Sequence, residues 1–146
     1  NQPLLAEVLG LIKRAHVIDL RRRDRIAHAV SLARAAMTGI WVAEQESSAN
    51  VEAHYSAEAV AAAERGIATQ TAVWERMFSD LRIEPLILWY EDVAAAPDTA
   101  LRQVADFLGV ALDPQGAVPL PAFKRQSGEA SRGWAERYAR DRAAVF

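Results

Sequence analysis

The sequence predicts an α/β protein in which parallel strands alternate with helices. Short apolar runs at residues 16–20 and 85–90 have the length of strands, and the stretches that follow each of them have helical periodicity. The second run is continuously apolar, which is typical of a strand covered on both faces, and the first is also expected to be buried. Two strands make a poor sheet, so either the sheet is completed elsewhere or a further strand lacks a clear signal.

Two helices are expected in the first third of the chain. Residues 3–14 form an amphipathic pattern, and a second helix begins near Asp24. The apolar stripe of this second helix consists of Ile26, Val30, Ala33, Met37 and Ile40. Its polar stripe consists of Asp24, His28, Ser31 and Thr38. The polar stripe faces either a ligand or water, and His28 is either a base or a surface histidine.

Three further helices are expected downstream. Ser56 is a suitable N-cap for a long helix over about residues 57–82. The core-facing seam of this helix consists of Val60, Ile67, Trp74 and Leu81, with Ala63, Gln70 and Met77 offset by three. Pro97 opens another helix, which Gly109 ends, and the charged tail at 132–144 is expected to be helical.

The composition fits one domain over residues 1–146. The chain is 51% hydrophobic and 25% charged, which is enough apolar material for a packed core. It has no cysteine, so disulfides and cysteine nucleophiles are excluded, and we expect a cytoplasmic location. No segment approaches the ~20 apolar residues of a membrane span. The first residue is Asn1 rather than Met, so the chain is a fragment, a processed product or a natural short protein.

Positive charge is concentrated at two places in a chain whose net charge is −2. Twelve of the 17 Lys and Arg residues lie in residues 13–25 or 124–142. If these segments meet in space, they form one cationic pocket in a mildly acidic protein. Such a pocket suits a small polyanion better than a nucleic acid, which usually binds a basic domain.

The first basic motif lies between a strand and a helix. Residues 19–25 read Asp-Leu-Arg-Arg-Arg-Asp-Arg, and Ser31 follows Arg23 after seven intervening residues. Guanidinium groups and the N–H groups of a helix start attract phosphate or sulfate when they converge on one point. The alternatives are a solvated arginine cluster and a nucleic-acid contact.

Two later motifs have similar chemistry. Tyr90, with Glu91 and Asp92, ends the second strand. A tyrosine ring at that place can pack against adenine. The alternative is a core tyrosine beside an acidic helix start. Residues 124–127, Lys-Arg-Gln-Ser, precede Trp134 and form either a phosphate-binding turn or an exposed basic loop.

In order and spacing, the three motifs resemble those of sulfotransferases that use PAPS (3′-phosphoadenosine 5′-phosphosulfate). Arg23 and Ser31 resemble the 3′-phosphate motif, Tyr90 begins a Tyr-Glu-Asp segment, and residues 124–127 resemble the late phosphate-binding loop. The Pro-led helix and the Phe-Leu-Gly turn at 107–109 also resemble the family. The Arg-Gln-Ser form of the late loop is more similar to the bacterial branch that resembles trehalose sulfotransferases. The resemblance extends from residue 16 to about residue 137.

The resemblance implies a layer of parallel strands like that of P-loop NTPases, with many helices. It implies transfer of a sulfuryl group from PAPS to a hydroxyl of a carbohydrate or glycolipid, without a metal. The residues implied for the 3′-phosphate are Arg23, Ser31, Arg125, Gln126 and Ser127. Tyr90 would lie near the adenine, and Thr38 and Trp41 near the acceptor.

The chain lacks the Gly/Ser/Thr-rich phosphosulfate loop that such enzymes have after their first strand. We therefore expect a C-terminal portion of a sulfotransferase domain, inactive by itself, with the loop and the catalytic base upstream of residue 1. The alternatives are a nucleotide-binding remnant without turnover, assembly with a second chain such as a homodimer, and a non-enzymatic helical module that binds a partner through the 57–82 seam.

Overall fold

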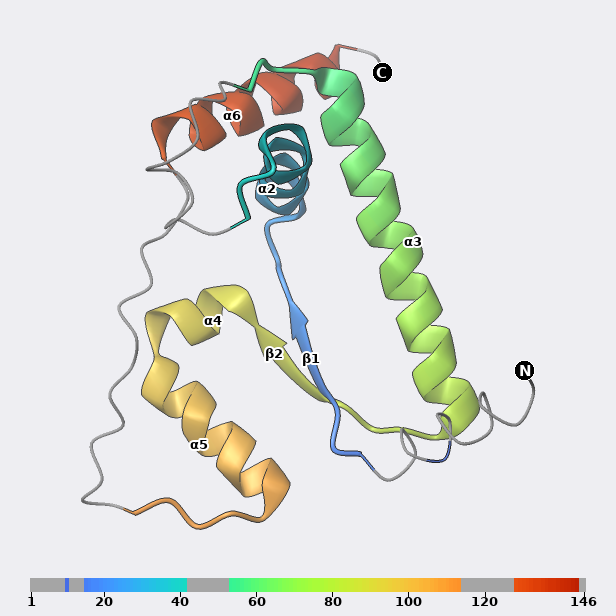
Figure 1. The fold of residues 1–146 in the computed structure, drawn as a ribbon, viewed down its shortest axis with the longest axis vertical. Helices are drawn as coiled ribbons and strands as arrows, with labels where there is room; N and C mark the ends of the chain where they lie inside the picture. The colour runs from blue at the N-terminus through green and yellow to red at the C-terminus, as the bar shows by residue number, and fades with distance from the viewer. Residues whose placement is uncertain (1–9, 11–14, 42–52, 114–127, 145–146) are drawn as a thin grey trace. The chain divides into compact units, whose positions relative to one another are not determined.

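The computed structural model describes residues 10, 15–41, 53–113 and 128–144. Its elements, in chain order, are β1 (Ile18–Arg21), α2 (Arg25–Thr38), α3 (Ala57–Leu81), β2 (Leu86–Trp89), α4 (Tyr90–Ala95), α5 (Pro97–Leu108) and α6 (Glu129–Ala143) (Figure 1). The chain divides into two compact units, residues 1–23 with 72–120 and residues 24–71 with 121–146. The helix predicted at 3–14 lies outside the described residues, apart from Gly10, which is helical.

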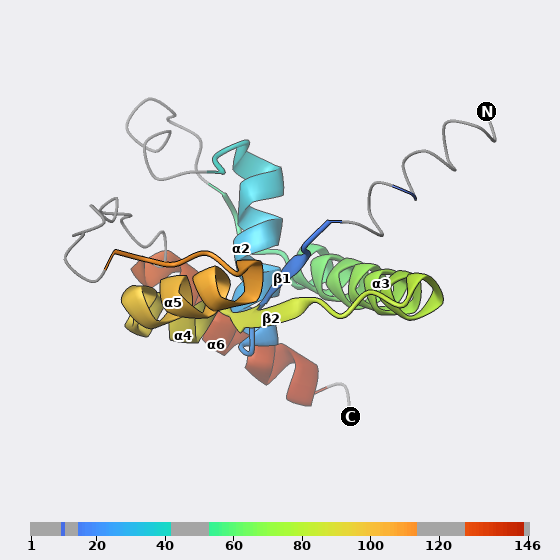
Figure 2. The same cartoon turned by 90° about the horizontal axis from the view of Figure 1, so that it is seen from below.

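The first unit contains a parallel pair of strands. β1 and β2 lie side by side, with Ile18 opposite Leu86 and Arg21 opposite Trp89 (Figure 2). The backbone N–H of Leu86 extends the pairing by donating to the carbonyl of Val17 at 2.9 Å. Because the two strands are parallel and are separated in sequence by helices, the predicted α/β class is confirmed.

The strands are less buried than the sequence predicted. Leu88 is buried, but the exposed fractions are 41% for Ile18, 58% for Leu20 and 44% for Ile87. The expectations of a buried first strand and of a second strand covered on both faces are therefore wrong for the residues described. The reason is that α4 and α5 pack against β2, whereas β1 has its main contacts with β2.

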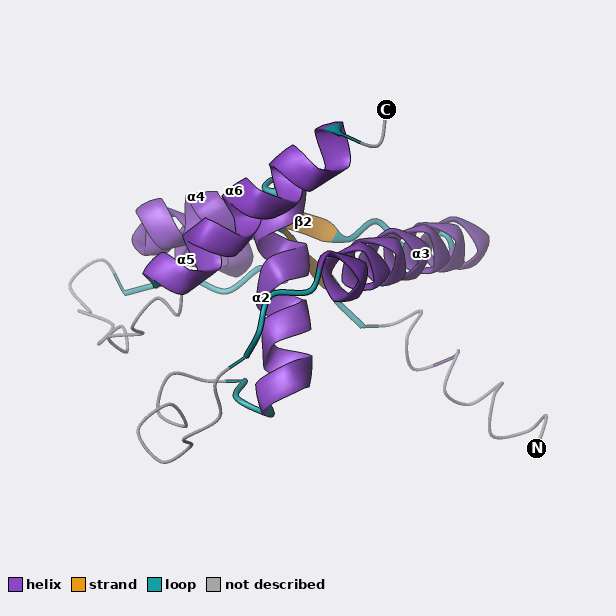
Figure 3. Ribbon diagram, turned by 90° about the horizontal axis from the view of Figure 1, so that it is seen from above, coloured by secondary structure: helices purple, strands orange, loops and turns teal. Residues whose placement is uncertain are grey.

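The second unit has its core where α2 packs against α6 and the first part of α3. Figure 3 shows α6 crossing α2. The buried residues are Ala29, Val30, Ala33, Val60, Trp134 and Tyr138. The apolar stripe predicted for α2 is confirmed at Val30 and Ala33, whereas Met37, near the end of the helix, is 39% exposed.

Helix α3 is confirmed, but its apolar seam is buried only at one end. Val60 is fully buried and Ile67 packs against the core of the second unit. Trp74, in the first unit, is 53% exposed and stacks on Phe78 with ring centroids 5.8 Å apart. A repeat of seven therefore predicted the helix correctly and the extent of its burial incorrectly, since burial also requires a neighbouring element.

Local capping explains several element ends. Asp24 caps α2 by accepting from the N–H of Ala27 at 2.9 Å, and Ser56 caps α3 as predicted, accepting from Ala59 at 3.1 Å. Gly109 ends α5 in the left-handed conformation, with φ 67°, as predicted. Helix α4 confirms the alternative of an acidic helix start at Glu91 and Asp92. Among the described residues, no helix is long and apolar enough to cross a membrane.

Candidate functional site

Two of the sequence motifs meet at one edge of the sheet in the first unit. Parallel strands end at the same edge, so the residues that follow β1 lie beside those that follow β2. We call this group the carboxyl-edge cluster; it consists of Arg22, Arg23, Trp89, Tyr90, Glu91 and Asp92. Arg23 and Asp92 are in direct contact although they are 69 positions apart in the sequence.

Both arginines of the cluster stack on aromatic rings. The guanidinium carbon of Arg22 lies 4.6 Å from the ring centroid of Tyr90, and that of Arg23 lies 4.9 Å from the ring of Trp89. These distances are within the range of cation–π attraction. Tyr90 is therefore at the sheet edge, as predicted, but as the first residue of α4 and with Arg22 over its ring.

A forked pair joins the arginine motif to the Tyr-Glu-Asp motif. Arg23 donates through Nη1 to Oδ1 of Asp92 at 2.6 Å and through Nη2 to Oδ2 at 2.7 Å. Its backbone N–H donates to Oε2 of Glu91 at 3.1 Å, and Nε of Arg22 lies 3.9 Å from Oε1 of the same carboxylate. The hydrogen bond from Arg23 lowers the pKa of Asp92, and the same bond raises the pKa of Arg23.

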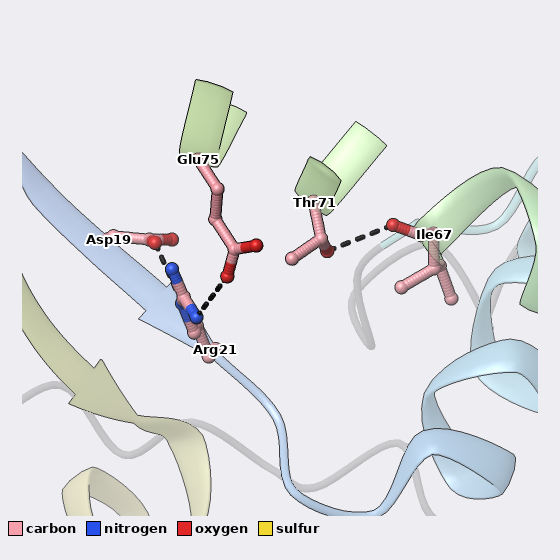
Figure 4. A network of polar contacts seen from close by, with 5 residues as sticks. All are labelled: Asp19, Arg21, Ile67, Thr71 and Glu75. Atoms are coloured by element: carbon pink, nitrogen blue, oxygen red, sulfur yellow. Dashed lines mark hydrogen bonds and ion pairs between the residues drawn. The ribbon is translucent and has the colours of Figure 1, made fainter. Parts of the chain in front are cut away.

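Arg21 is also paired with carboxylates. Its Nε donates to Asp19 and its Nη1 to Glu75, each at 2.8 Å (Figure 4). In the same figure, Thr71 donates to the carbonyl of Ile67 within α3. Three consecutive arginines thus have acidic partners, and the convergence of their charge on one phosphate stays a prediction. Asp19 lies within the motif, whereas Glu75, Glu91 and Asp92 are distant in sequence, so the arginine run alone did not indicate those three.

A pocket of about 210 Å³ adjoins the carboxyl-edge cluster. It lies among β2, α4 and α5, and Trp89, Asp92, Thr99 and Gln103 are part of its lining. Typical ligand pockets measure ~300–1,000 Å³, so this pocket by itself is too small to enclose a nucleotide.

The second unit contains a basic residue that the motifs did not include. Nη1 of Arg34, on α2, donates to the hydroxyl of Ser131 in the first turn of α6. Its guanidinium carbon lies 5.9 Å from the ring of Trp134, and its Nε is buried without a hydrogen-bond partner. No carboxylate among the residues that the structure describes forms an ion pair with it. The sequence signal that could have identified Arg34 is its position three residues after Ser31, which places both side chains on the same face of the helix.

The other predicted site residues have varied surroundings. Thr38 donates to the carbonyl of Arg34 at 2.9 Å and accepts from Ile40 at 3.2 Å, so its hydroxyl closes the end of α2. Trp41 is 58% exposed.

Arg125, Gln126 and Ser127 lie outside the described residues. Arg23 belongs to the first unit and Ser31 to the second, so their joint role stays a prediction. In the described part of the chain, no group of His, Asp and Glu is arranged to hold a metal.

The arrangement of strands, helices and motifs is accompanied by a family match over nearly the whole chain. Residues 3–141 match the family model described as Stf0 sulphotransferase. The chain therefore belongs to the Stf0 sulphotransferase family, and the resemblance inferred from its motifs is confirmed.

Two similar proteins are trehalose 2-sulfotransferases. The protein from Mycolicibacterium smegmatis is 30% identical over 125 residues, which cover 86% of this chain and 46% of that protein. The protein from Mycobacterium tuberculosis is 29% identical over 121 residues, which cover 83% and 44%. The chain thus spans less than half the length of either relative.

Proposed function

We propose that the protein transfers a sulfuryl group from PAPS to a hydroxyl of a carbohydrate or glycolipid, and that this chain carries the 3′-phosphate and adenosine side of the donor site. The contact between Arg22 and Arg23 and the Tyr90–Asp92 segment carries the proposal. These residues gather at the carboxyl ends of parallel strands, where α/β proteins bind nucleotides. The names of the two relatives support a sugar as the acceptor.

In this proposal the residues of this chain bind the donor and neutralise its negative charge, and none of them forms a covalent bond with it. The acceptor oxygen attacks sulfur in line, the base proposed outside this chain takes the hydroxyl proton, the bond from sulfur to the phosphate oxygen breaks, and 3′,5′-adenosine bisphosphate leaves. Arg23, Ser31 and residues 125–127 bind the 3′-phosphate, and Tyr90 lies near the adenine. Such residues accelerate a reaction by positioning the donor and by neutralising charge. Thr38 and Trp41 are proposed to lie near the acceptor.

Arg23 must exchange partners when the donor binds. The Arg23 and Asp92 side chains are 50% and 63% exposed, and exposed ion pairs are weak because water screens them. A phosphate dianion has more charge than the carboxylate and accepts the same fork of N–H donors. The phosphate therefore replaces Asp92 on Arg23.

The remaining parts of the enzyme are proposed to lie outside this chain. The relatives are more than twice as long as the stretches that match, and we assign the phosphosulfate loop and the catalytic base to the additional length. The same length would complete a P-loop-NTPase-like sheet as one sulfotransferase domain. A cytoplasmic location agrees with the absence of cysteine, and a homodimer is an alternative way to complete the site.

Isothermal titration calorimetry of the purified protein tests this function. The protein should bind 3′,5′-adenosine bisphosphate at least about tenfold more tightly than AMP, since the 3′-phosphate adds charge-assisted hydrogen bonds. Arg23→Gln should remove most of this preference, whereas Arg102→Gln, at an exposed position of α5, should retain it. Equal affinity for the two nucleotides would contradict the donor site and favour the non-enzymatic module.

A further inference from the structure

Arg34 is a partly buried cation whose charge has no acidic partner among the described residues. Its described contacts are the hydroxyl of Ser131 and the ring of Trp134, and its Nε has no partner. A guanidinium has five N–H donors, and among the described residues the Ser131 hydroxyl is the one hydrogen-bond acceptor that Arg34 meets. Removing a charge from water without a counter-charge is costly, and a bound anion would offset that cost.

Two carboxylates of the second unit have other partners. Glu64 accepts from Tyr138 at 2.9 Å and from Arg142 at 2.7 Å. Asp141 accepts from the Tyr55 hydroxyl at 2.5 Å. Glu129 lies in the first turn of α6, two positions before Ser131, and forms no ion pair with Arg34 among the described residues.

Two neighbouring features indicate the kind of anion that Arg34 would bind. Ser31 precedes Arg34 by three positions on α2, so their side chains project from the same face of the helix. Ser131, the hydroxyl partner of Arg34, lies in the first turn of α6, where helix dipoles favour negative charge. The N-cap of α6 is Gly128, which has no side chain to cap the helix, although its carbonyl accepts from the N–H of Ser131 at 3.1 Å.

We propose that Arg34 binds the phosphate that Ser31 binds, as an additional residue of the donor site. The ligand class is a phosphate dianion, supplied either by the 3′-position of a nucleotide or by inorganic phosphate. The assignment to the nucleotide rests on the function proposed above. Ser131 acts as a positioning residue that holds the guanidinium at the start of α6.

Calorimetry on the purified protein separates this role from a purely structural one. Arg34→Gln should weaken binding of 3′,5′-adenosine bisphosphate by about 10- to 100-fold, the usual loss for a charge-assisted contact, and change AMP binding by less than about twofold. Arg34→Lys keeps the charge without the fork and should lose about threefold to tenfold for the bisphosphate alone. Arg65→Gln, at an exposed position of α3 in the same unit, is the control and should bind both nucleotides as the wild type does.

Three results would overturn the proposal in distinguishable ways. If the wild type shows no preference for the bisphosphate, the proposed function fails together with this inference. If the wild type shows the preference and the folded Arg34 variants retain it, only the role of Arg34 fails. If Arg34→Gln loses binding of inorganic phosphate but retains the bisphosphate, Arg34 serves a separate anion. Should Arg34→Gln not fold, Arg34→Lys decides between these results.

Discussion

Arg34 in the second unit differs from Arg21, Arg22 and Arg23 in the first unit in what balances its charge. In the first unit, Arg21, Arg22 and Arg23 each have a carboxylate partner, at distances from 2.6 to 3.9 Å. In the second unit, Arg34 meets a hydroxyl and an indole ring. The density of arginines in a sequence therefore does not measure how much positive charge is available to a ligand. That quantity depends on which carboxylates the fold brings to each guanidinium.

The difference also separates two ways of binding an anion. An anion that binds Arg23 must first displace Asp92, whereas an anion that binds Arg34 displaces no carboxylate of the described residues. We therefore expect removal of the Asp92 charge in the first unit to strengthen binding of the anion, and removal of the Arg34 charge in the second unit to weaken it.

The largest expected effect concerns two tryptophans, one buried in the core of the second unit and one exposed in the first unit. Trp134 is 9% exposed and packs edge-on against Tyr55, whereas Trp74 is 53% exposed. Trp134→Ala should lower the free energy of unfolding by ~3–5 kcal/mol, because it leaves a cavity in the core. Trp74→Ala should lower it by ~1 kcal/mol, since it loses mainly one aromatic contact. Urea unfolding followed by circular dichroism measures both, and equal losses would contradict the assignment of the core.

The next effect concerns Ser31. Ser31→Ala should weaken binding of the bisphosphate by about 0.5–1.5 kcal/mol, the value of one hydrogen bond, and leave thermal stability almost unchanged. Ser79→Ala, at an exposed position of α3, is the matched control and should change neither quantity. Unchanged calorimetric affinity in a folded Ser31→Ala protein would remove Ser31 from the donor site.

A smaller effect of opposite sign is expected at Asp92. Asp92→Asn removes the charge that competes for Arg23, so affinity for the bisphosphate at pH 7 should rise about threefold, in line with a weak exposed ion pair. Asp106→Asn, on α5, changes the net charge equally and should have little effect. Since its hydrogen bond with Arg23 lowers the pKa of Asp92, the gain should be constant from neutral pH down to mildly acidic pH. A loss of affinity in Asp92→Asn would show that Asp92 positions Arg23 instead of competing for it.

The smallest expected effect lies at high pH in the second unit. Burial, with a contribution from the hydrogen bond to Asp141, raises the pKa of Tyr55 from 10.0 to about 12. The folded protein therefore holds this proton more tightly than the unfolded chain, so the associated stability is complete below pH 10.0 and is lost as the pH rises to about 12. Tyr55→Phe should lack this part of the alkaline loss in thermal melts. An identical alkaline profile in the variant would contradict the assignment.

Local signals in the sequence predicted the fold better than they predicted the site. Ser56 and Gly109 act within a few residues of themselves, so the start of α3 and the end of α5 were predictable. The exposure of Leu20 and Trp74 was not, because burial depends on elements distant in sequence. For the same reason the Arg23–Asp92 pair was missed although both residues had been identified. A single arginine such as Arg34 resembles a solvated helix residue until the residues that face it are known.

The side-chain NMR signals of the arginines test most directly the claim that uncompensated charge binds the donor. Nε–Hε correlations of the purified protein, assigned with Arg34→Lys, would be recorded during addition of 3′,5′-adenosine bisphosphate and, separately, of AMP. The Nε–Hε signal of Arg34 should shift with the bisphosphate and not with AMP, while that of Arg21, held by Asp19 and Glu75, should remain in place. A bisphosphate titration that shifts Arg21 and leaves Arg34 unchanged would contradict the account.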